Sequence, residues 1–185
     1  MKAIMIASSS ILSGSESVVL AGGMESMSSV PHYLPAIRAG KKLGHDQVVD
    51  GLLKDGLWDV YNDKHMGACT ESVNELYSVS RLDLDAFAAE TFRRASEATQ
   101  SGLFATEIVP VSVKNVNVLV DEHLGRVKVE KFSVLKPSFK TDGVLTPANS
   151  SPLSDGAAAV ILMSRKAAVD RGIAPLARVV AWADA

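Results

Sequence analysis

The 185-residue sequence has one cysteine and no long apolar run, and both absences exclude classes of protein. Because Cys69 is alone, no internal disulfide can form, and a reducing compartment fits this cysteine usage. Location stays open, with the cytoplasm favoured over the mitochondrion and the peroxisome. No apolar stretch approaches the roughly eighteen residues of a membrane span, and serines interrupt the first fourteen residues, where a signal peptide would be apolar. We therefore expect no membrane partner.

The sequence also lacks an excess of charge of either sign. Nineteen basic and twenty-one acidic residues give a formal net charge of -2, so no global field attracts nucleic acid. A content of 47% hydrophobic and 22% charged residues is typical of a folded globular domain, or of part of a larger one. The expected partner is therefore a small molecule or another protein.

The two ends of the chain have the texture of alternating helices and strands. Apolar spacing predicts a helix over residues 1–12 that ends at Gly14, and "SVVLAGG" predicts a buried strand after it. Near the other end, "GAAAVILMS" predicts a strand buried on both faces, "RKAAVDR" a short helix closed by Gly172, and "LARVVAWA" another strand. This alternation indicates the α/β fold class.

Residues 31–139 are more polar and irregular, which indicates an insertion between the two α/β parts. A first amphipathic helix there would carry one apolar face of Met66, Cys69, Val73, Leu76 and Tyr77. A second helix would begin at a capping box and end at a glycine. The stretch "EIVPVSV" would then form a strand, and this strand would lie at a sheet edge because Pro110 has no N–H to donate. The capping box is Ser80 to Asp83, and the glycine is Gly102.

The stretch "AGGMESMSSVP", residues 21–31, ends the first predicted strand with paired glycines. Gly22 and Gly23 permit positive φ angles or the close approach of another backbone or a ligand, because they have no Cβ. Met24 and Met27 would supply adaptable apolar packing. We therefore expect this strand end to lie against another part of the protein.

Several of these strings together resemble the thiolase family, most closely its acetyl-CoA C-acetyltransferase branch. They occur in the family's order, and they are "MKAIMIAS", "VVLAGGMESMSSVP", "DVYNDKHMGACTE", "NSSPLSDGAAAVILMS" and "PLARVVAWADA". The resemblance implies a partial layered αβαβα fold with an inserted loop domain. It assigns residues 1–30 and 140–175 to the first α/β half, 31–139 to the loop domain and 176–185 to the start of the second half.

By this resemblance, the chain would belong to an acyltransferase that condenses two acetyl-CoA to acetoacetyl-CoA, or cleaves acetoacetyl-CoA, through an acyl-cysteine. The family's nucleophile segment, Cys-x-Ser-Gly, would precede Met1, and its base motifs would follow Ala185, so no catalytic residue is assigned and the chain alone is expected to be inactive. The alternative is a non-catalytic truncated domain that binds coenzyme A or a partner. Cys69 with His65 one turn away could form a nucleophilic pair, but packing of Cys69 on the apolar face is favoured.

Binding residues are carried over position by position. The resemblance implies that His65 and Met66 line the acyl and pantetheine pocket and that Ser151 contacts the pantetheine arm. Arg126 and Lys131 would hold coenzyme A phosphates through charge-assisted hydrogen bonds. Asp155 would serve the turn into the following strand.

The resemblance also predicts cofactors and partners. Acetyl-CoA, acetoacetyl-CoA and coenzyme A are the expected ligands, and the full-length protein is expected to be a homo-oligomer. No cofactor is expected. Potassium, which one branch of the family binds through a tyrosine hydroxyl, is not expected because Phe92 stands at that position and offers no oxygen.

Overall fold

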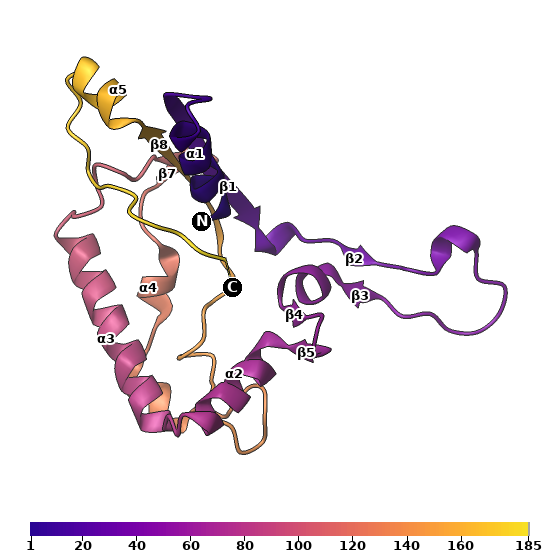
Figure 1. The fold of residues 1–185 in the computed structure, drawn as a ribbon. Helices are drawn as coiled ribbons and strands as arrows, with labels where there is room; N and C mark the ends of the chain where they lie inside the picture. Colours follow the sequence, from indigo (N-terminus) through magenta and orange to yellow (C-terminus); the bar gives the residue numbers. More distant parts are fainter. Residues whose placement is uncertain (185) are drawn as a thin grey trace. The chain divides into compact units, whose positions relative to one another are not determined.

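The computed structural model describes residues 1–184, which form two compact units (Figure 1). The first unit contains residues 1–30 and the residues from 153 onward, and the second contains residues 31–152. A segment from each end of the chain therefore builds the first unit.

In the first unit, helix α1 (Lys2–Leu12) packs on an antiparallel pair of strands, β1 (Val18–Ser26) and β8 (Asp155–Met163). The register runs from the pair Val18 and Met163 to the pair Ser26 and Asp155. A 3₁₀ turn, η1 (Met27–Ser29), follows β1, and helix α5 (Arg165–Asp170) follows β8. These helices and strands confirm the predictions from the sequence. Gly14 and Gly172, at φ +77° and +65°, close the two helices in the left-handed region as predicted.

Burial of these two strands was predicted wrongly. Only Ala21 is buried in β1, and β8 is exposed from Asp155 to Ile161. Side chains alternate between the faces of a sheet, so the face opposite Ala21 carries the cross-strand neighbours Leu20 and Ile161, which are 71% and 66% exposed. Two strands with one helix on them leave this apolar face uncovered.

Of the two roles expected for the glycine pair, positive φ angles and close approach of another group, only close approach is found. Neither Gly22 nor Gly23 has a positive φ, so the turn geometry is not needed. Close approach is confirmed for Gly22, where a Cβ would lie 2.9 Å from the carbonyl oxygen of Ala158, but a Cβ on Gly23 would meet nothing within 4 Å. One glycine of the pair is therefore required by the β1–β8 ladder.

The strand predicted for "LARVVAWA" is not formed. Residues 176–183 have no regular secondary structure. A strand exists only when a neighbour accepts and donates its ladder hydrogen bonds, and β8 pairs with β1 instead. The apolar, β-branched composition of residues 176–183 is therefore not sufficient to form a strand without a neighbouring strand to pair with.

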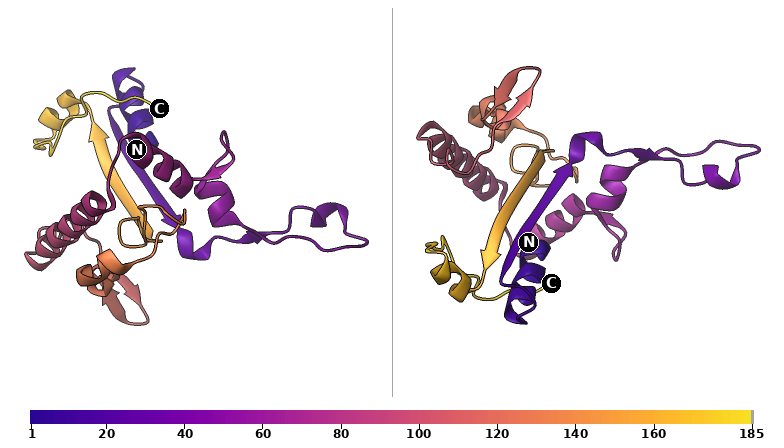
Figure 2. Two further views of the ribbon diagram at one scale, coloured as in Figure 1. Left: turned by 90° about the horizontal axis from the view of Figure 1, so that it is seen from below. Right: turned by 90° about the horizontal axis from the view of Figure 1, so that it is seen from above.

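The second unit is built from short hairpins and helices. Its first part contains β2 (His32–Tyr33), η2 (Ile37–Ala39), β3 (Val49–Asp50), a π-helical turn η3 (Leu52–Gly56), β4 (Trp58–Asp59), β5 (Lys64–His65) and helix α2 (Met66–Leu76). Its second part contains helix α3 (Arg81–Gln100), β6 (Val111–Val113), β7 (Val116–Val118), helix α4 (Glu122–Arg126) and the 3₁₀ segment η4 (Val129–Val134). Figure 2 shows the β2–β3 hairpin as an arm that extends away from α2 of the same unit.

The two predicted helices of this unit are confirmed. The predicted ends of α3 are correct, whereas the predicted packing face of α2 is not. Ser80 and Asp83 form the capping box of α3, and Gly102 follows its end at φ +69°. The predicted apolar face of α2 is exposed, with Val73 50% and Leu76 75% accessible. The buried residues of α2 are Gly67, Glu71 and Asn74, so this helix packs through a polar face.

Two boundaries also differ from expectation. The predicted strand "EIVPVSV" is limited to β6, which begins directly after Pro110 and pairs with β7. Residues 140–152 lie in the same compact unit as the loop segment, whereas the family resemblance assigns them to the first α/β half. The division into family halves stays a prediction.

Candidate functional site

The start of α2 holds two of the predicted site residues. His65 is the N-cap of the helix, and its Nδ1 accepts a hydrogen bond of 2.9 Å from the backbone N–H of Gly67. Its ring stacks on Phe139 with the ring centroids 4.9 Å apart. Since Nδ1 is an acceptor, the neutral ring carries its proton on Nε2. Met66, next to it, is 52% exposed and available to a ligand.

The glycine of the His-Met-Gly string is required by this packing. A Cβ at Gly67 would lie 2.5 Å from three ring carbons of Phe139. The ring of Phe139 therefore lies directly against the first turn of α2 and fixes the imidazole of His65 by stacking. The importance of Phe139 was not predicted, because no local pattern links it to a helix seventy residues earlier in the chain.

Arg126 and Lys131 lie on consecutive short elements. Arg126 ends α4, is 70% exposed and forms an ion pair of 2.8 Å with Glu122. Lys131 lies in η4. An exposed ion pair is weak, so Arg126 can exchange Glu122 for another anion at little cost.

A groove of about 550 Å³ lies between α3 and the α4 to η4 segment. Phe92, Leu124, Val127 and Val129 line it, and the polar residues Glu90, Arg93 and Ser96 line it as well. Phe92 packs edge-on against Phe132 and tilted against His123. In the sequence, Arg126 directly precedes the lining residue Val127, and Lys131 lies two positions after the lining residue Val129.

Ser151 follows a segment that a buried carboxylate holds on α2. Glu71, 4% exposed, accepts hydrogen bonds from the backbone N–H groups of Val144 and Leu145 at 3.0 and 2.9 Å. Gly143 is required there, because a Cβ would lie 2.2 Å from an oxygen of Glu71. The sequence places a lone acid on the buried face of α2, but its backbone partners could not be read from it.

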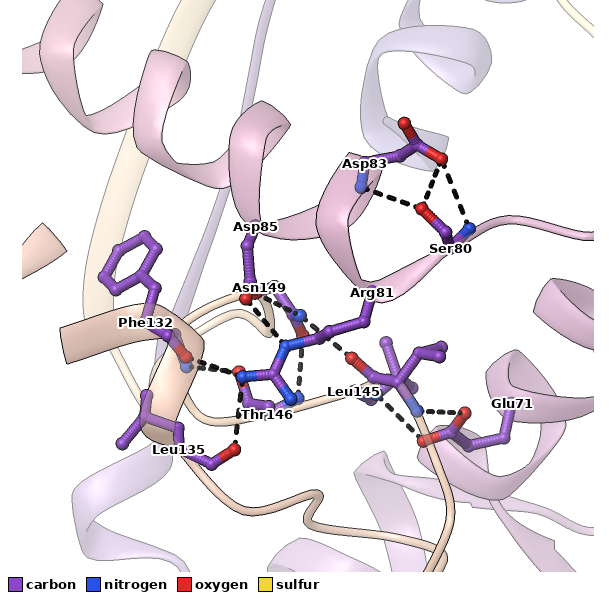
Figure 3. Close-up of polar contacts among 12 residues, drawn as sticks. Glu71, Ser80, Arg81, Asp83, Asp85, Phe132, Leu135, Leu145, Thr146 and Asn149 are labelled. Atoms are coloured by element: carbon purple, nitrogen blue, oxygen red, sulfur yellow. Dashed lines mark hydrogen bonds and ion pairs between the residues drawn. The ribbon is translucent and has the colours of Figure 1, made fainter. Parts of the chain in front are cut away.

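A second set of contacts continues from this segment to α3 (Figure 3). The amide nitrogen of Asn149 donates to Asp85 at 2.9 Å, and its oxygen accepts from the N–H of Thr146, a fully buried residue. Arg81 pairs with Asp85 at 2.7 Å and donates to the carbonyls of Phe132 and Leu135 at 2.6 and 3.1 Å. The segment before Ser151, α3 and η4 are thus tied by one polar network.

Cys69 does not pair with His65. Its thiol donates to Asp59 at 3.6 Å. Hydrogen bonds from Asn62, first from the side chain and then from the backbone, hold the pKa of the Asp59 carboxyl below its usual range, so this neighbour is anionic. Nucleophilic cysteines have positive neighbours that favour the thiolate. Met66 and Val73, on which Cys69 was predicted to pack, are 52% and 50% exposed, so the apolar face that they share is not a buried core.

Asp155 has the structural role expected of it. It accepts hydrogen bonds from the backbone and the hydroxyl of Ser28, so it joins the start of β8 to the turn after β1. Within residues 1–184, no group of three or more metal-binding side chains is found, and no helix is long and apolar enough to cross a membrane.

Comparison with known proteins gives a consistent result. The model of the thiolase N-terminal domain matches residues 1–166. Acetyl-CoA acetyltransferase 1 of Arabidopsis thaliana is 48% identical over 100% of this chain and 46% of its own length, and a probable acetyl-CoA acetyltransferase of Dictyostelium discoideum is 44% identical over 100% and 46%. The chain thus spans about half the length of the curated relatives it matches.

Solved structures agree. The Acat5 thiolase of Ascaris suum, crystallised with coenzyme A, has 40% identity and a TM-score of 0.87 over 94% of this chain and 45% of its own. An acetyl-CoA acetyltransferase of Syntrophomonas wolfei has 38% identity and a TM-score of 0.88 over 95% and 45%. The fold is therefore that of part of an α/β thiolase. This chain belongs to the thiolase family.

Proposed function

We propose that the chain is the coenzyme A-binding portion of an acetyl-CoA C-acetyltransferase. The whole enzyme would condense two acetyl-CoA to acetoacetyl-CoA, or cleave acetoacetyl-CoA with coenzyme A, through a cysteine acyl intermediate. The observation that carries this proposal is the 48% identity to an acetyl-CoA acetyltransferase over the whole chain. Oligomeric assembly of the whole enzyme is part of the same proposal.

Within this proposal, five residues of the second unit have binding tasks. The basic side chains of Arg126 and Lys131 bind coenzyme A phosphates, and the groove between α3 and the α4 to η4 segment receives the nucleotide. His65, Met66 and Ser151 line the path of the pantetheine arm. The Ascaris suum thiolase, 40% identical to this chain, was solved with coenzyme A, which supports coenzyme A as the ligand class. No metal or cofactor has a task in this proposal.

A chimera tests the activity directly. The matching segment of the Syntrophomonas wolfei acetyl-CoA acetyltransferase is replaced by this chain, and thiolysis of acetoacetyl-CoA is measured. We expect activity in the chimera and loss of activity when its catalytic cysteine is changed to alanine. A folded chimera that binds coenzyme A but does not cleave acetoacetyl-CoA would contradict the proposed reaction.

A second function, binding without catalysis, is favoured for the 185-residue chain by itself. The supporting observation is the hydrogen bond from Cys69, the single cysteine, to the Asp59 carboxylate. Purified chain should bind coenzyme A in calorimetry and show no thiolysis. Thiolysis that disappears in Cys69→Ala would instead make Cys69 a nucleophile and would contradict this second function.

A further inference from the structure

Glu71 carries a buried carboxylate that joins helix α2 to the segment around residues 144 and 145. It lies on the polar face of α2, 4% exposed, and both of its oxygens accept backbone hydrogen bonds from Val144 and Leu145. A backbone hydrogen bond of 2.8 Å from Ser138 to Leu145 closes the same segment on itself. Burial of a carboxylate is costly unless it is fully hydrogen-bonded, so these contacts fix the segment strongly relative to α2.

The residues held by this carboxylate are the ones that lead to Ser151. The oxygen of Asn149 accepts from Thr146, directly after the clamped pair, and its amide group donates to Val144 and to Asp85. These contacts carry the constraint along the segment to within two residues of Ser151. At the other end, Glu71 lies one helical turn and a half from His65, the N-cap of the same helix.

We propose that Glu71 is a positioning residue, which acts through Val144 and Leu145 to hold Ser151 in register with His65 and Met66 for the pantetheine arm of a coenzyme A thioester. This inference rests on the proposed coenzyme A site. Glu71 itself does not touch the ligand. Its carboxylate suits this role because each of its two oxygens accepts from one of two adjacent backbone N–H groups.

The test is a double-mutant cycle between Glu71 and Ser151. Glu71→Gln keeps the shape of the side chain but replaces one acceptor by an N–H donor, so we expect coenzyme A to bind about tenfold more weakly in calorimetry. Ser151→Ala should weaken binding as well. If Glu71 acts through Ser151, the double variant should lose clearly less than the product of the two single effects.

A control variant is available on the same helix. Glu75 forms a surface ion pair with Lys140 and is 62% exposed, so Glu75→Gln should leave coenzyme A affinity within about twofold of wild type and combine additively with Ser151→Ala. Amide hydrogen exchange at Val144 and Leu145 should be accelerated about tenfold or more by Glu71→Gln and not by Glu75→Gln.

The outcomes separate this inference from the proposed function. If wild-type chain binds no coenzyme A, the proposed site and the positioning role are both lost. If wild type binds but Glu71→Gln binds equally well, or its effect is additive with that of Ser151→Ala, the positioning role is contradicted and the site remains. If Glu71→Gln does not fold, as judged by circular dichroism, the cycle is run with Asn149→Ala, which releases the same segment from Asp85 and Val144. Additive losses with that variant would also overturn the inference.

Discussion

The ring of Phe139 lies so close to Gly67 that a Cβ at residue 67 would be 2.5 Å from it. Gly67→Ala should therefore push the ring off the first turn of α2, break its stacking on His65 and destabilise the fold by about 1 to 3 kcal/mol, as overpacking typically does. Urea unfolding measures this loss.

Gly125→Ala is the matched control for this change. Gly125 lies in α4, and a Cβ there would meet nothing within 4 Å. Alanine favours helix over glycine by up to about 1 kcal/mol, so this variant should be neutral or slightly more stable. A Gly67→Ala variant as stable as Gly125→Ala would mean that Phe139 moves aside freely and would contradict the prediction.

The paired glycines of β1 give a second prediction, because only one of them is crowded. Gly22→Ala would bring a Cβ to 2.9 Å from the carbonyl oxygen of Ala158, a backbone atom that cannot move without opening the β1–β8 ladder. We expect a loss of about 1 to 3 kcal/mol in unfolding free energy. Gly23→Ala meets nothing within 4 Å and should be neutral. A larger effect at Gly23 would contradict the β1–β8 register.

A pH-dependent contribution is expected at the junction of β1 and β8. Hydrogen bonds from Ser28, first from its hydroxyl and then from its backbone, hold the pKa of Asp155 below its usual value. A lowered pKa in the folded state means that the contribution is fully present above the unfolded pKa of about 3.9 and is lost as pH falls through the folded pKa.

Ser28→Ala removes the hydroxyl and tests this sign. The difference in melting temperature between wild type and Ser28→Ala should be largest near neutral pH and should shrink below about pH 4. A difference that grows in acid would contradict the assignment of Asp155 as the charged partner.

Local signals in the sequence predicted local structure well. The capping box at Ser80 and the closing glycines at Gly14 and Gly102 fix helix ends through contacts within a few residues, and all three are confirmed. The strand predicted at 176–183 failed because strand formation depends on a partner that composition does not name. The prediction that β8 is buried failed for a related reason, since burial depends on which other elements cover the sheet.

The candidate site divides along the same line. His65 and Met66 were predicted because the string "HMG" resembles a family motif, and their role in binding stays a prediction. Glu71, Arg81 and Phe139 were not found, because each acts through a residue more than fifty positions away, such as Leu145, Phe132 or His65. On α2, apolar periodicity predicted the wrong packing face, because the apolar stripe is exposed and the polar stripe is buried.

The basic side chains of Arg126 and Lys131 give a prediction on affinity. If Arg126 and Lys131 bind coenzyme A phosphates, Arg126→Gln and Lys131→Gln should each weaken binding by about 1 to 3 kcal/mol, with Arg126 near the lower limit because it is 70% exposed. Added salt should weaken wild-type binding more than that of the double variant. Calorimetry at two ionic strengths measures both effects. An unchanged dissociation constant in the double variant would remove both residues from the site.

The last prediction concerns association of the 185-residue chain through its uncovered sheet face. Leu20 and Ile161 are cross-strand neighbours on the face of β1 and β8 opposite Ala21, and they are 71% and 66% exposed. Exposed apolar sheet faces and edges favour self-association. Light scattering at micromolar concentration should therefore show oligomers, and Leu20→Thr with Ile161→Thr should reduce them, because threonine keeps strand propensity while removing apolar surface.

Another exposed cross-strand pair provides the control for this experiment. Val111 and Val118 face each other in the β6–β7 hairpin and are 60% and 49% exposed, so Val111→Thr with Val118→Thr makes the same chemical change on the second unit. We expect this control to leave the oligomers largely intact, because a two-stranded hairpin offers much less apolar area than the nine-residue strands β1 and β8. A monodisperse wild-type monomer, or oligomers that dissociate only in the hairpin variant, would show that the β1–β8 face is not the contact surface.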